Sequence, residues 1–331
     1  MRGISRRSES SRYYRGSPPR SPSAPLTARS SLTTPDLALI IAVVALFGFA
    51  FVPIKIALKE IPPFALASVR FFLAAVPAMF FVKRPTMPWR NIIAYGLAIG
   101  VFQYGLLFLG INLGMPVGLT SLVIQVQVFF TMGLAVMLGS DRLTRVNVAG
   151  GAIAAAGIVI LALYKIVNGM TGTLLGFVLI LIAGFSWAVG NMIGKKAAGR
   201  DHADMFSLVV WSSIVPALPL ALLSYLFEGG PAVVSSVIHA SWLTWGCVLM
   251  LSWGATLFCF GSWAALLHRY PVGLITPYGL LIPVSGLFFG ALLLGERLAL
   301  VQLAGVVLVM GGLVMNAFGE RWFAVLRTPR R

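Results

Sequence analysis

The chain has 331 residues, of which 59% are hydrophobic and 10% are charged, and its formal net charge is +16. Soluble domains carry about 25% charged residues. Together with a mean hydropathy of +0.93, this composition excludes an ordinary soluble domain and indicates a membrane protein.

The first 36 residues are rich in Ser, Arg and Pro and differ sharply from the rest of the chain. They lack the apolar core of a secretory signal. We therefore expect residues 1–36 to be a disordered cytoplasmic tail. A transit peptide is an alternative, because such peptides are also rich in Arg and Ser and poor in acidic residues.

Ten apolar runs follow, each long enough to cross a hydrocarbon core of about 30 Å as a helix. Helices are preferred to barrel strands because the apolar character is continuous, whereas strands would alternate. Most of the breaks between runs are short, so consecutive helices should be antiparallel neighbours, with little room for an extramembrane domain. The runs are 37–58, 64–82, 91–112, 117–139, 146–164, 173–194, 206–227, 242–267, 273–294 and 300–318, and a short basic tail, 319–331, ends the chain.

The basic residues are distributed asymmetrically between the two sides of this predicted bundle. One side holds only Lys59, Lys165 and Arg297. Because basic residues favour the cytoplasmic side, both termini are predicted to be cytoplasmic. The same distribution accounts for the positive charge without nucleic acid. The other side holds Lys83, Arg84, Arg90, Arg142, Arg145, Lys195, Lys196, Arg200, Arg269, seven arginines before residue 30, Arg321, Arg327, Arg330 and Arg331.

The chain also contains an internal repeat. The four residues PVGL occur at 116–119 and again at 271–274. Each half would contain five helices, and an odd number places the second half upside down in the membrane. Inverted repeats of this kind are typical of secondary transporters, so we expect repeats at 37–164 and 173–318. The same 155-residue shift aligns Asp141-Arg142-Leu143 with Glu296-Arg297-Leu298, Ala149-Gly150 with Ala304-Gly305, and Gly157 with Gly312.

Several short motifs resemble those of a known family. Phe47-Gly48 leads to Lys55, Pro62-Pro63 leads to Arg70, and Glu296-Arg297-Leu298 ends the ninth run. In these features the chain resembles the EamA-type branch of the drug/metabolite transporter superfamily over roughly residues 36–322. It is similar in particular to the amino-acid metabolite exporters of that branch, through Gly114-Met115-Pro116-Val117-Gly118-Leu119, Ser121-Leu122-Val123, Phe185-Ser186-Trp187-Ala188, Gly190-Asn191, Lys195-Lys196 and Ser207-Leu208-Val209-Val210-Trp211-Ser212.

The resemblance implies a fold and a function. The fold would be an all-α integral membrane protein with ten transmembrane helices in two inverted five-helix repeats. The function would be export of small amino-acid metabolites such as O-acetylserine or cysteine across the plasma membrane. An exporter of drugs or of another metabolite, or an importer, is the alternative.

Ionisable and amide side chains inside the apolar runs are the candidates for substrate binding, because polar groups in a membrane are costly. Arg70 lies too deep to reach the interface easily, whereas Lys55 could extend to it. The amides of Gln125 and Gln127 could bind substrate or join neighbouring helices. The predicted substrate site lies near the midplane and comprises Arg70, Gln103, Gln125, Gln127, Trp187, Asn191 and Tyr278.

No carboxylate lies deep in an apolar run, so a buried proton relay is not predicted. We expect either facilitated export or ion coupling through helix-end Asp141 or Glu296. The chain shows no H-E-x-x-H, G-x-S-x-G or Gly-rich nucleotide motif, and we expect neither enzymatic activity nor a cofactor or metal. The expected partners are a small-molecule substrate and the lipid bilayer, and a homodimer is left open.

Overall fold

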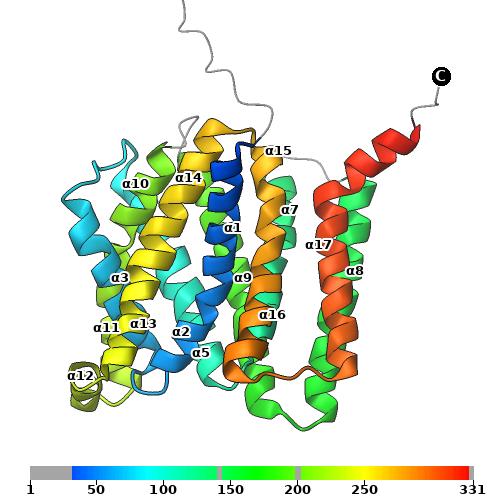
Figure 1. Ribbon diagram of the computed structural model, residues 1–331. Coiled ribbons are helices and arrows are strands. Elements are labelled where there is room, and N and C mark those ends of the chain that lie inside the picture. The colour runs from blue at the N-terminus through cyan, green and yellow to red at the C-terminus, as the bar shows by residue number, and fades with distance from the viewer. Residues whose placement is uncertain (1–31, 140–143, 198–202, 328–331) are drawn as a thin grey trace, which may run out of the picture.

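The computed structural model describes residues 32–139, 144–197 and 203–327, and these residues form a bundle of helices (Figure 1). The first half begins with Thr33, whose side chain caps the opening turn of the first helix. Proline or glycine precedes or opens several of the later helices, since proline is tolerated in a first turn. The helices are α1 (Thr34–Phe49), α2 (Phe51–Ala57), α3 (Pro63–Met79), α4 (Trp89–Gly96), α5 (Gly105–Asn112), α6 (Val117–Val123), α7 (Gln127–Met137) and α8 (Arg145–Val167).

The second half follows the same all-helical pattern. Its helices are α9 (Thr171–Ala197), α10 (Ala203–Ser212), α11 (Ile214–Phe227), α12 (Pro231–Ile238), α13 (Trp242–Leu249), α14 (Phe260–Arg269), α15 (Val272–Ile275), α16 (Leu281–Leu294) and α17 (Leu300–Arg327). Two spans contain π-helical segments, η1 (Leu97–Tyr104) and η3 (Met250–Cys259), and two contain short 3₁₀ segments, η2 (Ile124–Val126) and η4 (Thr276–Leu280).

Within the described part of the chain, nine helical segments are long and apolar enough to cross a membrane, and Pro63–Met79 is a shorter apolar helix. All ten lie where the sequence predicts an apolar run. The all-α membrane fold is therefore confirmed. The breaks that divide single spans into two or three named elements, such as the one after Phe49, have no counterpart in the predicted runs.

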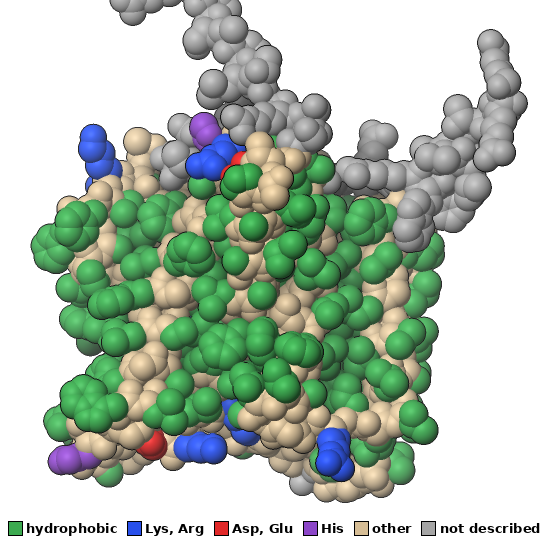
Figure 2. All heavy atoms as spheres, in the orientation of Figure 1, with side chains coloured by type: hydrophobic (Ala, Val, Ile, Leu, Met, Phe, Trp, Pro, Cys, Tyr) green, Lys and Arg blue, Asp and Glu red, His purple; other side chains and the backbone are tan. Residues whose placement is uncertain are grey.

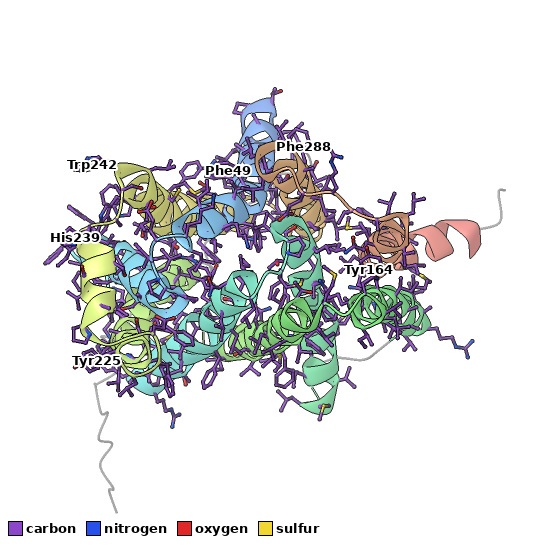
Figure 3. The ribbon with its side chains drawn as sticks, turned by 90° about the horizontal axis from the view of Figure 1, so that it is seen from below. Phe49, Tyr164, Tyr225, His239, Trp242 and Phe288 are labelled. Atoms are coloured by element: carbon purple, nitrogen blue, oxygen red, sulfur yellow. The ribbon has the colours of Figure 1, made fainter. Side chains whose placement is uncertain are left out.

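The outer surface suits a lipid environment. Hydrophobic side chains cover the flank of the bundle, and charged side chains gather towards its two ends (Figure 2). The first residues of α1 and the last turns of α17 lie at the same end, which we call the tail side (Figure 1). At the opposite end, the far side, α12 lies at one edge near Tyr225, His239 and Trp242 (Figure 3). Trp242 is 92% exposed, as expected of an aromatic anchor at a membrane interface.

Helices α8 and α17 pack chiefly against each other and stand at one edge of the bundle (Figure 3). Glycines bring their backbones together. A Cβ atom on Gly150 would lie 2.8 Å from the carbonyl oxygen of Gly312, and one on Gly157 would lie 2.6 Å from that of Gly305. Small residues commonly allow such close approach between membrane helices.

Three carboxylates cap helix N-termini on the far side. Glu228 accepts hydrogen bonds from the backbone N–H groups of Phe64 and Ala65 at 2.8 and 3.2 Å, at the start of α3. Glu60 accepts from the backbone and side chain of Ser241 at the start of α13. Glu296 provides the third cap, because its carboxylate accepts hydrogen bonds from the first backbone N–H groups of α6. Each satisfies donors that a helix leaves unpaired and complements its dipole, so the far side is held together across several helices.

Candidate functional site

A cavity of about 520 Å³ lies inside the bundle. Its lining comes from spans of both halves of the chain and is mainly apolar and aromatic, as is usual for small-molecule sites. The aromatic residues of the lining are Phe47, Phe51, Tyr95, Tyr104, Trp187, Phe206, Phe260 and Trp263. Among the described residues of the lining, Arg70 is the only one that carries a formal charge.

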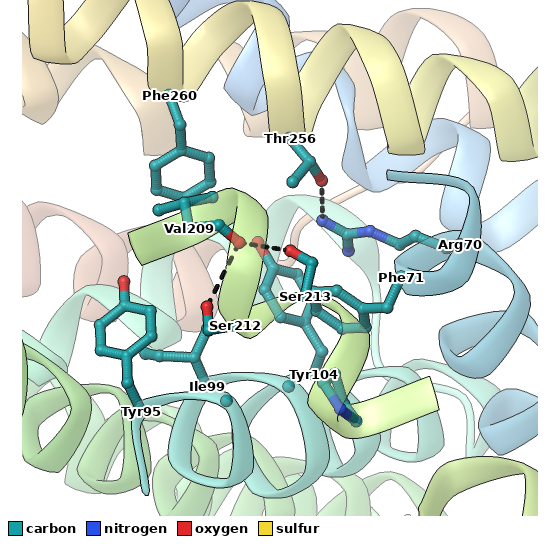
Figure 4. A pocket seen from close by; sticks show the side chains of 13 residues that line it. Arg70, Phe71, Tyr95, Ile99, Tyr104, Val209, Ser212, Ser213, Thr256 and Phe260 are labelled. Atoms are coloured by element: carbon teal, nitrogen blue, oxygen red, sulfur yellow. Dashed lines mark hydrogen bonds between the residues drawn. The ribbon is translucent and has the colours of Figure 1, made fainter. Parts of the chain in front are cut away.

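Arg70 is almost fully buried, with 1% of its surface exposed. It lies seven residues after the start of α3, roughly 10 Å along the helix at 1.5 Å per residue. Its Nη2 donates a hydrogen bond to Thr256 Oγ1 at 3.0 Å (Figure 4), and its Nε has no hydrogen-bond partner in the described structure. Aromatic rings surround it, and the guanidinium carbon lies 4.9 Å from the centroid of the Phe71 ring.

This environment is costly for a cation. An unpaired buried charge loses hydration that aromatic contacts and one hydrogen bond replace only in part. Asp36 and Arg269 form an ion pair at the tail side, but no ion pair is recorded for Arg70 within the described ranges. A ligand carboxylate would provide the charge and the acceptor atoms that the guanidinium lacks.

The two π-helical segments place polar side chains near Arg70, Gln103 in the lining of the cavity and Thr256 in that of a smaller pocket beside it. Gln103, on η1, is 1% exposed, and its Oε1 has no hydrogen-bond partner among the described residues. Thr256, on η3, donates to the carbonyl of Leu251 five residues earlier, at 3.0 Å. π-Helical segments are rare and frequently occur at functional sites. The extra residue in each turn rotates the following side chains around the helix axis, which the sequence alone does not predict.

Gln125 and Gln127, both named in the predicted site, both line the cavity. The 3₁₀ segment η2 lies between α6 and α7 and alters the angular spacing of these residues. Gln127 also has the second role considered above, because its Oε1 accepts a hydrogen bond from Asn191 Nδ2 at 2.9 Å. Asn191 also donates to Thr131 Oγ1 at 3.3 Å, so this pair joins α7 to α9 at the cavity wall.

Six of the seven residues proposed for the site therefore line one cavity. They are Arg70, Gln103, Gln125, Gln127, Trp187 and Asn191. Tyr278 is not part of the lining, although its neighbours Thr276 and Gly279 are. Its ring packs instead against a cluster that contains Ile40 and Leu266. It lies on the 3₁₀ segment η4.

Two other ionisable candidates, Lys55 and Glu296, are not part of the cavity lining. Lys55 donates a hydrogen bond to the carbonyl of Ile111 at 3.3 Å, near the end of α5, where a cation complements the helix dipole. The Glu296 carboxylate accepts hydrogen bonds from the backbone N–H groups of Val117 and Gly118 at 2.6 and 2.9 Å. Asp141 lies outside the described residues.

Sequence reasoning missed the hydroxyl groups near Arg70. Ser212 and Ser213 lie at the break between α10 and α11 and, with Thr256, line a small pocket beside the guanidinium (Figure 4). A signal for this break exists in the sequence, because Pro216 cannot donate a helical hydrogen bond to the carbonyl of Ser212. The position of Thr256 depends on the π-helical segment and has no comparable signal.

The cavity is positioned towards the tail side. Its lining includes Met205 and Phe206 near the start of α10, and Trp263 and Leu267 near the end of α14, and both of these helix ends lie on the tail side (Figure 1). On the far side, fully buried apolar residues such as Ile61 and the three carboxylate caps join the helices. The arrangement can hold a small molecule with a negatively charged group near the middle of the bundle.

Comparison with known proteins gives a consistent result. A model of the EamA-like transporter family matches residues 35–163 and 174–318. A protein of Salmonella typhimurium strain LT2, named probable amino-acid metabolite efflux pump, is 45% identical over 88% of this chain and 97% of its own length. A protein of the same name from Escherichia coli K12 is 41% identical over 87% and 96%. A solved crystal structure with 17% identity has a TM-score of 0.59 over 90% of this chain and 100% of that chain, which shows similarity of fold alone.

Proposed function

Because this chain belongs to the EamA-like transporter family, we propose that it is a secondary transporter that exports small amino-acid metabolites, such as O-acetylserine or cysteine, across the plasma membrane. The substrate would occupy the cavity between the two halves of the chain. The names of the two bacterial relatives support this substrate class.

The observation that carries the proposal is the buried guanidinium of Arg70 at the wall of the cavity, whose Nε has no hydrogen-bond partner among the described residues. A carboxylate of the substrate would bind it through charge-assisted hydrogen bonds. The amides of Gln103 and Gln125 provide further acceptors and donors in the same cavity. The aromatic lining suits the apolar part of a small metabolite.

We propose two inverted repeats, 37–164 and 173–318, as the basis of alternating access. The family model matches each half separately, which supports this division. The helix contacts at α8 and α17 support it too. The predicted alignment pairs Gly150 with Gly305 and Gly157 with Gly312, and the observed contacts join Gly150 to Gly312 and Gly157 to Gly305. Such reciprocal contacts are expected of two related segments packed around a two-fold axis.

For the orientation, we propose that both termini are cytoplasmic. The basic residues of the described tail-side segments, including Arg84, Arg90 and Arg269, support this. With this orientation, the cavity lies towards the cytoplasm and the three carboxylate caps lie on the outer face. The structure would then correspond to a state that receives substrate from inside the cell.

Transport would occur either by facilitated diffusion, without ion coupling, or with ion coupling through the helix-end carboxylate of Asp141 or Glu296. The described lining of the cavity includes no Asp or Glu, so the cavity itself offers no carboxylate for proton exchange.

Transport by the purified protein tests the proposal. The protein would be reconstituted into liposomes, and the release of preloaded O-acetylserine or cysteine measured by mass spectrometry. Release faster than in protein-free liposomes, with chemically unchanged solute, is expected. Failure to move any amino acid, together with release of drugs or dyes, would favour the alternative exporter. Single-cysteine labelling of residues 1–36 and 319–331 in intact cells tests the orientation, and labelling from outside would contradict it.

A further inference from the structure

A small pocket adjoins the cavity at Arg70 (Figure 4). Its wall is mainly apolar and aromatic, and Ser212, Ser213 and Thr256 add three hydroxyl groups to it. We call it the serine pocket, after Ser212 and Ser213. Its volume is about 20 Å³, and a space of roughly 10–15 Å³ is enough for one water-sized group. It shares Arg70, Tyr95 and Tyr104 with the lining of the large cavity. A molecule bound in the cavity could therefore place one small polar group in this pocket.

The serine and threonine hydroxyl groups of the pocket are arranged as acceptors. Ser212 Oγ and Ser213 Oγ both donate to the carbonyl of Val209, at 3.2 and 2.6 Å. Thr256 Oγ1 donates to the carbonyl of Leu251. Each hydroxyl has one proton, so these three oxygens have only lone pairs left for a ligand, and Thr256 already accepts one bond from Arg70.

The main chain adds a further hydrogen-bond acceptor to the pocket. Pro216 lacks an N–H group, so the carbonyl of Ser212, four residues earlier, loses its usual helical donor. That oxygen lies against α4, 2.7 Å from the position that a Cβ atom on Gly96 would occupy. Gly96 is itself part of the pocket wall. The break between α10 and α11 therefore brings an acceptor-rich turn next to the guanidinium.

Two complementary binding environments thus adjoin each other. The guanidinium of Arg70, with its unpartnered Nε, attracts a carboxylate. The serine pocket attracts a group that donates several hydrogen bonds. An ammonium group donates three and accepts none, and an α-amino acid carries a carboxylate and an ammonium on the same carbon atom.

We propose that the serine pocket binds the ammonium group of an α-amino acid whose carboxylate is bound by Arg70. This inference rests on the proposed function and assigns substrate-binding roles to Ser212 and Ser213. It also provides acceptors for the ammonium group in a cavity whose described lining contains no carboxylate. The side chain of the amino acid extends into the large cavity, so the head group is recognised closely and the side chain loosely.

The test compares L-cysteine with 3-mercaptopropionate, which has the same thiol and carboxylate but lacks the amino group. Their affinities would be measured in reconstituted protein, under reducing conditions, by competition with radiolabelled cysteine. The wild-type protein should prefer L-cysteine by about tenfold or more, as expected for hydrogen bonds to a charged group. The double variant Ser212→Ala/Ser213→Ala should bind L-cysteine about tenfold more weakly and 3-mercaptopropionate with unchanged affinity. Arg70→Ala should weaken both.

Ser224→Ala is the matched control. Ser224 is a buried serine of α11, 2% exposed, and lies outside both cavities. It should bind both ligands like the wild type. The single variants Ser212→Ala and Ser213→Ala, each expected to lose part of the preference, provide the test if the double variant does not fold.

The outcomes separate the two proposals. Equal weakening of both ligands in the serine variants, or full retention of the preference for L-cysteine, would overturn the assignment of the serine pocket. A wild-type protein that binds neither ligand and transports no amino acid would contradict the proposed function itself.

Discussion

The guanidinium carbon of Arg70 lies 4.0 Å from the centroid of the Tyr104 ring. The flat guanidinium can stack on an aromatic face, whereas the ammonium of a lysine is a compact point charge. The Tyr104 ring therefore covers one side of the guanidinium, and the hydrogen bond to Thr256 holds one of its edges. The N–H groups of the guanidinium that do not bond to Thr256 can donate hydrogen bonds to a carboxylate.

The first prediction concerns this arginine. Arg70→Ala should weaken substrate binding by about 10- to 150-fold, because a hydrogen bond to a charged group contributes about 1.5–3 kcal/mol. Arg70→Lys should also weaken it, because it keeps the charge but loses the stacked plane. Lys55→Ala is the control and should change affinity less than about threefold, since Lys55 lies outside the cavity lining. Transport affinity, normalised to protein in the membrane, would measure this. Equal effects at both positions would contradict it.

The second prediction separates the two glutamines. Gln125→Ala and Gln127→Ala should each weaken substrate binding by about 2- to 12-fold, which corresponds to about 0.5–1.5 kcal/mol for a lost hydrogen bond. Only Gln127→Ala should also lower the melting temperature, because it removes the bond to Asn191. Hydrogen bonds between membrane helices contribute about 0.6 kcal/mol on average. A double-mutant cycle of Gln127→Ala with Asn191→Ala would measure the coupling, and additive effects would show that the bond contributes nothing.

The third prediction concerns ion coupling. Glu296→Gln should lower the stability of the protein, because its carboxylate caps two backbone N–H groups of α6, and such caps contribute about 0.5–2 kcal/mol. If Glu296 or Asp141 also exchanges a proton, Glu296→Gln combined with Asp141→Asn should abolish the response of export to an imposed pH gradient. Export from liposomes at matched and unmatched pH would measure this. A double variant that still follows the gradient would exclude both carboxylates.

The fourth prediction compares adjacent glycines of α8. Gly150→Ala should destabilise the protein by about 1–3 kcal/mol, the usual range for overpacking, because its Cβ would lie 2.8 Å from the Gly312 oxygen. Gly151→Ala should be close to neutral, since its Cβ would meet the Phe129 ring at an ordinary 3.5 Å. Thermal unfolding, monitored by size-exclusion chromatography of heated samples, would compare the stabilities of the two variants. A similar loss in both would indicate a general sensitivity of α8 rather than a close contact at one point.

The fifth prediction concerns pH on the far side. Hydrogen bonds from the backbone and then the side chain of Ser241 lower the pKa of Glu60 below its usual 4.5. A carboxyl group whose pKa is lower in the folded state stabilises the fold above pH 4.5, and the contribution is lost as pH falls through the folded-state pKa. The wild-type protein should therefore lose stability more steeply below about pH 4.5 than Glu60→Gln does. Parallel curves of melting temperature against pH would contradict this.

The membrane spans could be predicted from the sequence because each one is marked by a long, continuous run of apolar residues. A lipid-facing helix needs apolar residues along its whole length, and all ten helices lie where the runs predict them. Arg70 and the amides could be found because a polar group in such a run stands out. Their common cavity could not be derived, since it depends on how five or more helices pack together.

Local departures from α-helical geometry account for the site features that could not be predicted from the sequence. Tyr278 was predicted for the site as a polar aromatic residue of the ninth run, and the structure has it on a 3₁₀ segment, packed against a separate cluster. Thr256 reaches Arg70 from a π-helical segment that no residue pattern predicts. Ser212 and Ser213 are common residues in membrane helices, so only their position at the α10–α11 break makes them candidates.

The pairing of α8 with α17 also bears on how the protein is made. α8 ends at Val167 and α17 begins at Leu300, so a ribosome adding about 5–20 residues per second needs on the order of ten seconds to supply the partner. During that interval the glycine-lined face of α8 and Asn147, which later bonds Asn316 at 2.8 Å, must be exposed to lipid or held by the insertion machinery. α17 thus completes the packing of a helix made much earlier, and a chain that stops before it leaves α8 without its main partner.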